Sequence, residues 1–323
     1  MDTLSRTTGT ALITGAHGFI GQHLSRSLAA SGQRVCGLGH GIWPESEAAA
    51  WGLSLWLNGD IAPGNLRLLQ HQFGTPDVVY HLAGGSSVGA AVANPREDFF
   101  RTVATTAELL EWLRLDAPDT RLVVVSSAAV YGAGHSGPIA EGARLMPFSP
   151  YGHHKRLMEE LCHSYAASYG QRVSIARLFS VFGAGLKKQL LWDLCTRLAA
   201  GTEPLRLGGS GEELRDWTEV RDVVRALPLL AAQASSPACV VNVSTGTGTC
   251  VREVAGSIAS LWAGVGQHAA ALAFSGESRA GDPFSLIGDP GRLAALGFEW
   301  RLPLASGLRD YVEWFREQRV RGS

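Results

Sequence analysis

The chain has 323 residues, of which 46% are hydrophobic and 18% are charged, and its formal net charge is −1. This composition is ordinary for a globular protein and lacks the basic surplus typical of nucleic-acid-binding proteins. No apolar run reaches transmembrane length, and the N-terminal apolar stretch is interrupted by glycines, unlike a signal peptide, so we expect no membrane partner. The five cysteines are scattered without a C-x-x-C pair. We therefore expect a cytoplasmic protein without a zinc site or a disulfide scaffold.

The first predicted strand, residues 11–14, ends in a glycine-rich turn. Glycines at positions 15, 18 and 21 lead into an amphipathic helix predicted over residues 22–30. A turn of this kind lets the N–H groups at a helix N-terminus approach a pyrophosphate, so we interpret it as a dinucleotide-binding loop. The residues expected at the cofactor in this turn are Gly15, His17, Gly18, Phe19 and Ile20.

Four more strands are predicted along the first half of the chain, at residues 34–38, 55–61, 77–85 and 121–127. Helical stretches such as residues 96–115 separate the later strands, and near-continuous apolar strands separated by helices indicate a parallel sheet covered on both faces. Ligands in such sheets bind beyond the carboxyl ends of the strands. Small or polar residues that fall at these ends are Gly15, Asp60, Ala83 and Ser127.

A phenol and an ammonium lie four residues apart at Tyr151 and Lys155, directly after Ser149-Pro150. Pro at the first helical position and Ser before it predict a helix start, which places both side chains on one helix face. A neighbouring cation favours the phenolate, and bringing a phenol near neutrality requires roughly 3–4 kcal/mol of differential stabilisation. The pair therefore suits proton exchange with a carbonyl or alcohol, although a partly buried Tyr beside a solvated Lys often produces the same pattern.

Several motifs occur in a characteristic order, and together they resemble one family. They are Thr14-Gly15-x-x-Gly18-Phe19-Ile20-Gly21, Asp60-Ile61, His81-Leu82-Ala83-Gly84, Ser126 to Gly132, Tyr151-x-x-x-Lys155, Arg177 to Gly183, Gly209 to Val223, Asn242 to Gly246 and Arg279 to Pro283. The chain resembles an extended short-chain dehydrogenase/reductase of the sugar-nucleotide epimerase/dehydratase group. The resemblance covers nearly the whole chain.

The resemblance implies roles for individual residues. Tyr151 would be the acid/base, Lys155 would hold the nicotinamide ribose and lower the pKa of the phenol, and Ser127 would bond the reacting oxygen. Hydride would move between the nicotinamide and a sugar carbon, most often C4 of a hexose. Further cofactor contacts implied are Asp60, Ile61, Leu82, Ala83 and Gly84. Substrate contacts implied are Ser86, Ser180, Arg215 and Arg279, the two arginines gripping the diphosphate unless they form only surface salt bridges.

Two departures from the family pattern narrow the reaction. Ala128 and Ala129 stand where dehydratases carry Asp-Glu, so a 4,6-dehydratase is not expected. Gly39 stands where NAD-using relatives place an acid on the adenosine ribose, and the absence of an acid leaves room for a 2′-phosphate. His40 would then donate to that phosphate, or it is only a loop residue. This favours NADP over NAD and, narrowly, an NADPH-dependent 4-keto sugar reductase over a nucleotide-sugar 4-epimerase with tightly bound NAD. A non-catalytic NADP-sensing regulator is the distant alternative.

The remaining polar residues concern hydrogen bonding and metal binding. Thr102 and Ser180 replace two asparagines usual in the family, and both retain hydrogen-bonding capacity. His153 and His154 lie between Tyr151 and Lys155, so we expect them to point away from that pair's shared face, and no metal is expected.

The predicted architecture is α/β, with a Rossmann-type doubly wound parallel sheet and a smaller α/β substrate-binding domain. The first domain is expected to span residues 1–177, with residues 214–243 returning to it, and the second to comprise residues 178–213 and 244–323. Helices near residues 99–115 and 151–169 match those that relatives use in a four-helix interface, so the resemblance implies a homodimer.

Overall fold

The computed structural model describes residues 9–277 and 283–322, so Arg279 lies outside the described residues. The chain divides into two compact units. Unit 1 comprises the described residues up to Tyr131, together with Arg144–Leu178 and Val224–Val241. Unit 2 comprises Gly132–Ala143, Phe179–Val223 and the described residues from Asn242 onward.

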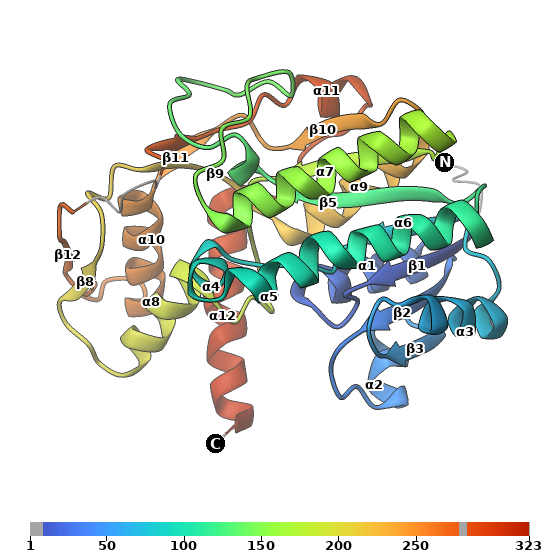
Figure 1. Ribbon diagram of the computed structural model, residues 1–323. Helices are drawn as coiled ribbons and strands as arrows, with labels where there is room; N and C mark the ends of the chain where they lie inside the picture. The colour runs from blue at the N-terminus through green and yellow to red at the C-terminus, as the bar shows by residue number, and fades with distance from the viewer. Residues whose placement is uncertain (1–8, 278–282, 323) are drawn as a thin grey trace. The chain divides into compact units, whose positions relative to one another are not determined.

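A seven-stranded sheet forms the centre of unit 1, with one edge strand, β10, crossing the unit boundary (Figure 1). In spatial order its strands are β10 (Cys239–Val243), β6 (Val173–Leu178), β5 (Arg121–Ser127), β4 (Val78–His81), β1 (Thr10–Thr14), β2 (Arg34–Gly39) and β3 (Leu55–Asn58). From β6 to β3 all neighbours pair in parallel. The order 3-2-1-4-5-6 is typical of dinucleotide-binding sheets, so the predicted Rossmann-type fold is confirmed.

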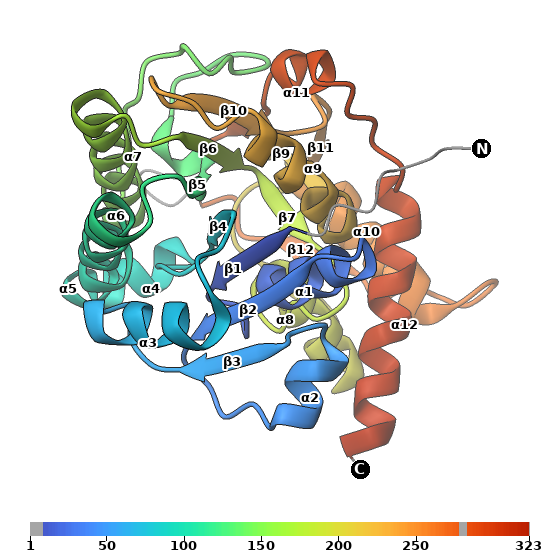
Figure 2. The ribbon, with the colours of Figure 1, turned by 90° about the vertical axis from the view of Figure 1, so that its right-hand side faces the viewer.

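Helices cover both faces of this sheet. They are α1 (Phe19–Ala30), α2 (Glu45–Ala50), α3 (Pro63–Phe73), α4 (Val88–Ala93), α5 (Pro95–Phe99), α6 (Thr105–Asp116), α7 (Pro150–Tyr169) and α9 (Val220–Ala232), the last crossing the unit boundary. Figure 2 shows α3, α6 and α7 side by side on one face of the sheet and α1 on the other. On the first of these faces, Leu12, Val124 and Leu109 belong to one continuous apolar core.

The observed elements differ from the predicted ones mainly at their ends. Helix α1 begins at Phe19, three residues earlier than predicted, because the glycine turn itself provides the first helical residues. The helix predicted from residue 96 is interrupted by a π-helical segment, Phe100–Ala104, between α5 and α6. Such segments widen one helical turn, which apolar periodicity does not reveal.

Unit 2 contains two small sheets and the helices that pack on them. Strand β9 (Leu214–Glu219) pairs with β7 (Ser180–Phe182), β11 (Gly248–Cys250) and β13 (Ser285–Leu286), and β8 (Leu205–Leu207) pairs with β12 (Leu272–Phe274). The remaining helices are α8 (Gln189–Ala199), α10 (Val251–Ala263), α11 (Gly291–Ala295) and α12 (Leu304–Gly322). None of the described helices has the length and apolarity needed to span a membrane.

Candidate active site

The glycine-rich turn lies between β1 and α1, where its backbone is tightly constrained. Gly15 has a φ of +72°, and a Cβ there would come within 3.0 Å of the Ala83 backbone nitrogen. At Gly21 a Cβ would lie 2.4 Å from the Gly15 carbonyl oxygen. Helix α1 has no side-chain cap at Gly18 and no acidic residue in its first turn. An uncapped helix N-terminus behind a close-packed glycine turn fits a dinucleotide pyrophosphate, so the residues present match the cofactor that the sequence predicts.

The strand ends beside this turn carry the other predicted cofactor residues. Gly39 ends β2, and a Cβ there would meet the Trp56 ring and the Gly15 backbone at 3.4 Å, an ordinary contact distance. His40 Nε2 lies 3.0 Å from Asp60 Oδ1, and both side chains are exposed. The Ile61 side chain belongs to the core, which leaves only its backbone for a ligand.

Aromatic side chains surround the same edge, which sequence reasoning missed. The His17 ring packs edge-on against Trp43 with 4.9 Å between centroids, and Trp43 packs in the same way on Trp56 at 5.4 Å. Helix α1 and strand β2 separate His17 from Trp43, and α2 separates Trp43 from Trp56, so only the folded chain brings them together.

Ser127 and Tyr151 meet at the carboxyl end of β5. Ser127 is the last residue of β5, its hydroxyl oxygen accepts from the Ala129 N–H at 3.2 Å, and its side chain is hydrogen-bonded to Tyr151. Tyr151 is the second residue of α7, whose N-terminus is capped as predicted, because Ser149 Oγ accepts from the Gly152 N–H. Burial raises the pKa of Tyr151 above its usual value, while the bond from Ser127 opposes that rise and the charge on Asp98 adds to it.

Lys155 lies one turn further along α7 and is almost fully buried. Its Nζ donates to the Val125 carbonyl oxygen at 2.9 Å, and a Cβ on Gly84 would lie 3.3 Å from the same Nζ. Burial lowers the pKa of Lys155 to about 8, although nearby negative charges, Asp98 first among them, favour the ammonium. In this chain, burial therefore has a larger effect on both pKa values than the mutual effect of phenol and ammonium that the sequence predicts.

The loop after β4 is bound to the π-helical segment and to α7. The Gly85 N–H donates to Thr102 Oγ1 at 2.8 Å, so Thr102 anchors this loop. The buried Asp98 carboxylate lies against Gly85, since a Cβ there would come 1.7 Å from Asp98 Oδ1. His154 Nδ1 lies 2.6 Å from Asp98 Oδ2. This contact joins α7 to α5, which packs against it.

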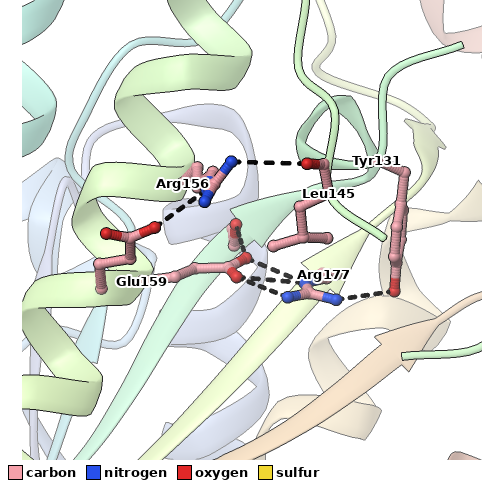
Figure 3. A network of polar contacts seen from close by, with 7 residues as sticks. Tyr131, Leu145, Arg156, Glu159 and Arg177 are labelled. Carbon is pink, nitrogen blue, oxygen red and sulfur yellow. Dashed lines mark hydrogen bonds and ion pairs between the residues drawn. The ribbon is translucent and has the colours of Figure 1, made fainter. Parts of the chain in front are cut away.

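A buried ion pair fixes α7 to the sheet two turns beyond Tyr151 (Figure 3). Arg177 on β6 binds both carboxylate oxygens of Glu159, the shortest contact being 2.7 Å, and its Nη1 donates to the Tyr131 hydroxyl at 3.0 Å. Ser126 on β5 donates to the same carboxylate at 2.5 Å. Since Glu159 lies four residues after Lys155 on α7, this network holds the catalytic face of the helix against β5 and β6.

Ser127, Tyr151 and Lys155 thus lie together in unit 1, as do the predicted cofactor residues at the ends of β1 to β4. Ser86, also in unit 1, follows the Gly84-Gly85 turn. Two predicted substrate residues belong to unit 2: Ser180 begins β7, and Arg215 lies in β9 with its Nη1 donating to the Leu214 carbonyl oxygen at 2.8 Å. Among the described residues, no three His, Cys, Asp or Glu side chains gather as a metal site.

The geometry suits reversible proton exchange between Tyr151 and an alcohol or carbonyl. Ser127 provides a hydroxyl at the phenol, Lys155 a buried cation one turn away, and the glycine turn a place for a dinucleotide. The next two side chains after Ser127 are Ala128 and Ala129, which have no ionisable group to remove a second proton.

Comparisons with known proteins agree with this geometry. The model of the NAD dependent epimerase/dehydratase family matches residues 11–244. A UDP-glucose 4-epimerase of Azospirillum brasilense is 28% identical, over 94% of this chain and 91% of the relative.

Two solved structures share the fold over almost their full length. MoeE5, solved with UDP-glucuronic acid and NAD, is 33% identical with a TM-score of 0.82, covering 96% of this chain and 100% of that one. DesIV of Streptomyces venezuelae, a dTDP-glucose 4,6-dehydratase solved with NAD, is 28% identical with a TM-score of 0.84, covering 96% and 98%. With the family model matched over most of its length, the chain belongs to the NAD-dependent epimerase/dehydratase family, whose enzymes are extended short-chain dehydrogenases/reductases.

Proposed function

We propose that this protein is a 4-epimerase of a nucleotide-activated hexose and that it retains NAD throughout its cycle. The observation that carries the proposal is the trio of Ser127, Tyr151 and Lys155 beside a glycine turn, with no acidic residue at positions 128 and 129. Relatives across most of the chain bear 4-epimerase names and act on UDP sugars, which makes a UDP-hexose the preferred substrate class.

The proposed mechanism assigns one task to each residue. Bound NAD would supply reversible hydride transfer at the sugar C4. Tyr151, as the phenolate, takes the proton of the C4 hydroxyl as hydride leaves C4, and the resulting phenol returns a proton to the oxygen after the 4-keto sugar has presented its other face. Ser127 hydrogen-bonds the same oxygen. The Lys155 ammonium would hold the nicotinamide ribose, and it stabilises the phenolate form of Tyr151.

Cofactor and substrate contacts complete the proposal. The cofactor would lie on the Gly15–Ile20 turn and at the ends of β2, β3 and β4, at Gly39, Asp60 and Ala83. Arg215 and Arg279 would bind the diphosphate, because a guanidinium matches phosphate oxygens in bidentate geometry, and Ser86 and Ser180 would bind the sugar or phosphate.

A second candidate, NADPH-dependent 4-keto sugar reductase, is favoured by one observation. Gly39 presents no acid to repel a 2′-phosphate, and the exposed His40 stands beside it. One contact weakens that argument, because His40 is already engaged with Asp60. The relatives that bear 4-epimerase names also favour the first candidate. We therefore place the epimerase first.

The nucleotide that remains on the purified enzyme separates the two candidates. The protein is denatured and the released nucleotide is identified by chromatography, and turnover of UDP-glucose is followed without added cofactor. The proposal predicts released NAD and conversion to the C4 epimer. An empty enzyme that turns over a 4-keto sugar only with added NADPH would establish the reductase. A non-catalytic regulator would bind nucleotide but convert neither substrate.

We also propose a homodimer in the cytoplasm. Apolar side chains are exposed within residues 99–115 and on α7, among them Phe99, Phe100, Leu115 and Leu157. These helices match those that the family resemblance assigns to a four-helix interface, so the proposed occupant is a second copy of the chain. Analytical ultracentrifugation of Phe100→Glu, which places a charge on this face, is expected to show monomer where the native chain shows dimer.

A further inference from the structure

Asp98 is a buried carboxylate in the candidate active site for which the proposed mechanism has no task. It lies near the end of α5, and its side chain is only 5% exposed. One oxygen lies against Gly85 in the loop after β4, and the other lies 2.6 Å from His154 on α7. Burying an ionised carboxylate costs free energy unless it is paired. The position of Asp98 between a loop and a helix that both belong to the site therefore indicates a role in the reaction.

Asp98 faces ionisable groups of α7. His154 contacts it directly, and Lys155 is the next residue, its Nζ beside Gly84 in the same loop whose Gly85 lies against Asp98. Both Lys155 and Tyr151 feel the charge of Asp98. A negative charge makes proton loss harder for every neighbour, so Asp98 raises the pKa of Lys155 and of Tyr151. Glu159, which also favours the Lys155 ammonium, is itself bound by Arg177. Asp98 is thus the first among the charges that oppose the effect of burial on Lys155.

We propose that Asp98, held in place by His154, is a positioning residue of the reaction whose buried negative charge keeps Lys155 in its ammonium form. Burial alone drives Lys155 toward the neutral amine, which can neither offset a phenolate nor bind a ribose as a cation. The Asp98 carboxylate supplies the missing electrostatic support from the side of α5. The role of Asp98 in catalysis rests on the proposed function, whereas its effect on the charge state of Lys155 does not.

The chain permits a direct measurement of that charge state. It has only three lysines, Lys155, Lys187 and Lys188, so lysine labelled with ¹³C at the ε carbon gives a simple NMR spectrum. In the native protein, the Lys155 resonance is expected to titrate at a pH of about 8. In Asp98→Asn, which keeps the shape and removes the charge, its midpoint should fall by about one pH unit. The resonances of Lys187 and Lys188 serve as internal references.

A matched control lies one residue away. Glu97 is an exposed acid on the same helix, paired with Arg101 at 2.6 Å, so Glu97→Gln removes one negative charge without touching the buried site. The Lys155 midpoint should stay in place in Glu97→Gln. In His154→Gln, which leaves the Asp98 charge present, the midpoint should stay or rise. A midpoint unchanged in Asp98→Asn, or lowered equally in His154→Gln, would overturn the inference.

Turnover adds the functional readout. If the proposed reaction holds, both limbs of the pH profile of kcat should move to lower pH in Asp98→Asn, because the pKa values of Tyr151 and Lys155 both fall. A general loss of activity at all pH values, with both limbs in place, would mark a structural role only and contradict the proposal. Absence of epimerase turnover in the native protein would refute the proposed function. The NMR titration would then test the effect of Asp98 on the charge state of Lys155 by itself.

Discussion

Replacing Arg177 by Met should strongly destabilise the protein, because it leaves a carboxylate buried without its cation. Arg177 and Glu159 are 4% and 2% exposed, and the guanidinium makes three contacts with the carboxylate (Figure 3). Breaking a buried pair by removing one partner costs about 3–5 kcal/mol, whereas a median exposed pair contributes about 0–1 kcal/mol. We therefore expect Arg177→Met to lower the free energy of unfolding by about 3–5 kcal/mol, measured by urea denaturation.

The same substitution at Arg156 is the matched control. Arg156 lies on α7, pairs with the exposed Glu160 at 2.9 Å and contacts the Leu145 carbonyl oxygen. Arg156→Met should cost no more than about 1 kcal/mol. Adding Glu159→Leu to Arg177→Met should recover part of the loss, since no charge then remains buried. Equal effects of the two single substitutions, or no recovery in the double variant, would refute the view that this network holds α7 in place.

Three further perturbations address the cofactor end and the helix that carries Tyr151. Gly21→Ala should abolish NAD binding, measured by calorimetry, because its Cβ would lie 2.4 Å from a backbone oxygen. Gly256→Ala is the control and should leave NAD binding unchanged, because a Cβ there meets nothing within 4 Å. Equal NAD binding in both variants would contradict the tight turn. Gly39→Asp should weaken NADP binding relative to NAD binding by at least about tenfold, since a carboxylate repels a 2′-phosphate. An unchanged ratio of the two dissociation constants would show that residue 39 does not determine which cofactor binds. Ser149→Ala should lower the free energy of unfolding by about 0.5–2 kcal/mol through loss of the α7 cap, and no loss in urea denaturation would mean that the cap is dispensable.

Local patterns were sufficient to predict the parallel sheet and the start of α7. Apolar runs ending in glycine or small residues predicted the strands, and Ser149-Pro150 predicted the capped N-terminus that places Tyr151 in its second position. Both predictions depend on interactions between residues close in sequence, so periodicity and capping chemistry are enough to reveal them.

The electrostatics of the site depended on contacts that no local pattern reveals. Asp98 and His154 are 56 positions apart, and their contact requires α5 to pack on α7. The sequence likewise predicted a lowered pKa for Tyr151, whereas burial raises it, because burial depends on how the whole unit closes around the phenol. A π-helical segment at Thr102 and the Trp56 ring beside Gly39 were hidden for the same reason.

The fate of the hydrogen at C4 of the sugar tests the central proposal most directly. UDP-glucose carrying deuterium at C4 is incubated with the purified protein without added cofactor, and the product is analysed by mass spectrometry and NMR. An epimerase that retains its NAD removes this hydrogen and returns the same atom, so we predict the C4 epimer with the deuterium still at C4. A product that has lost the label, or no product until NADPH is supplied with a 4-keto sugar, would contradict the proposed function.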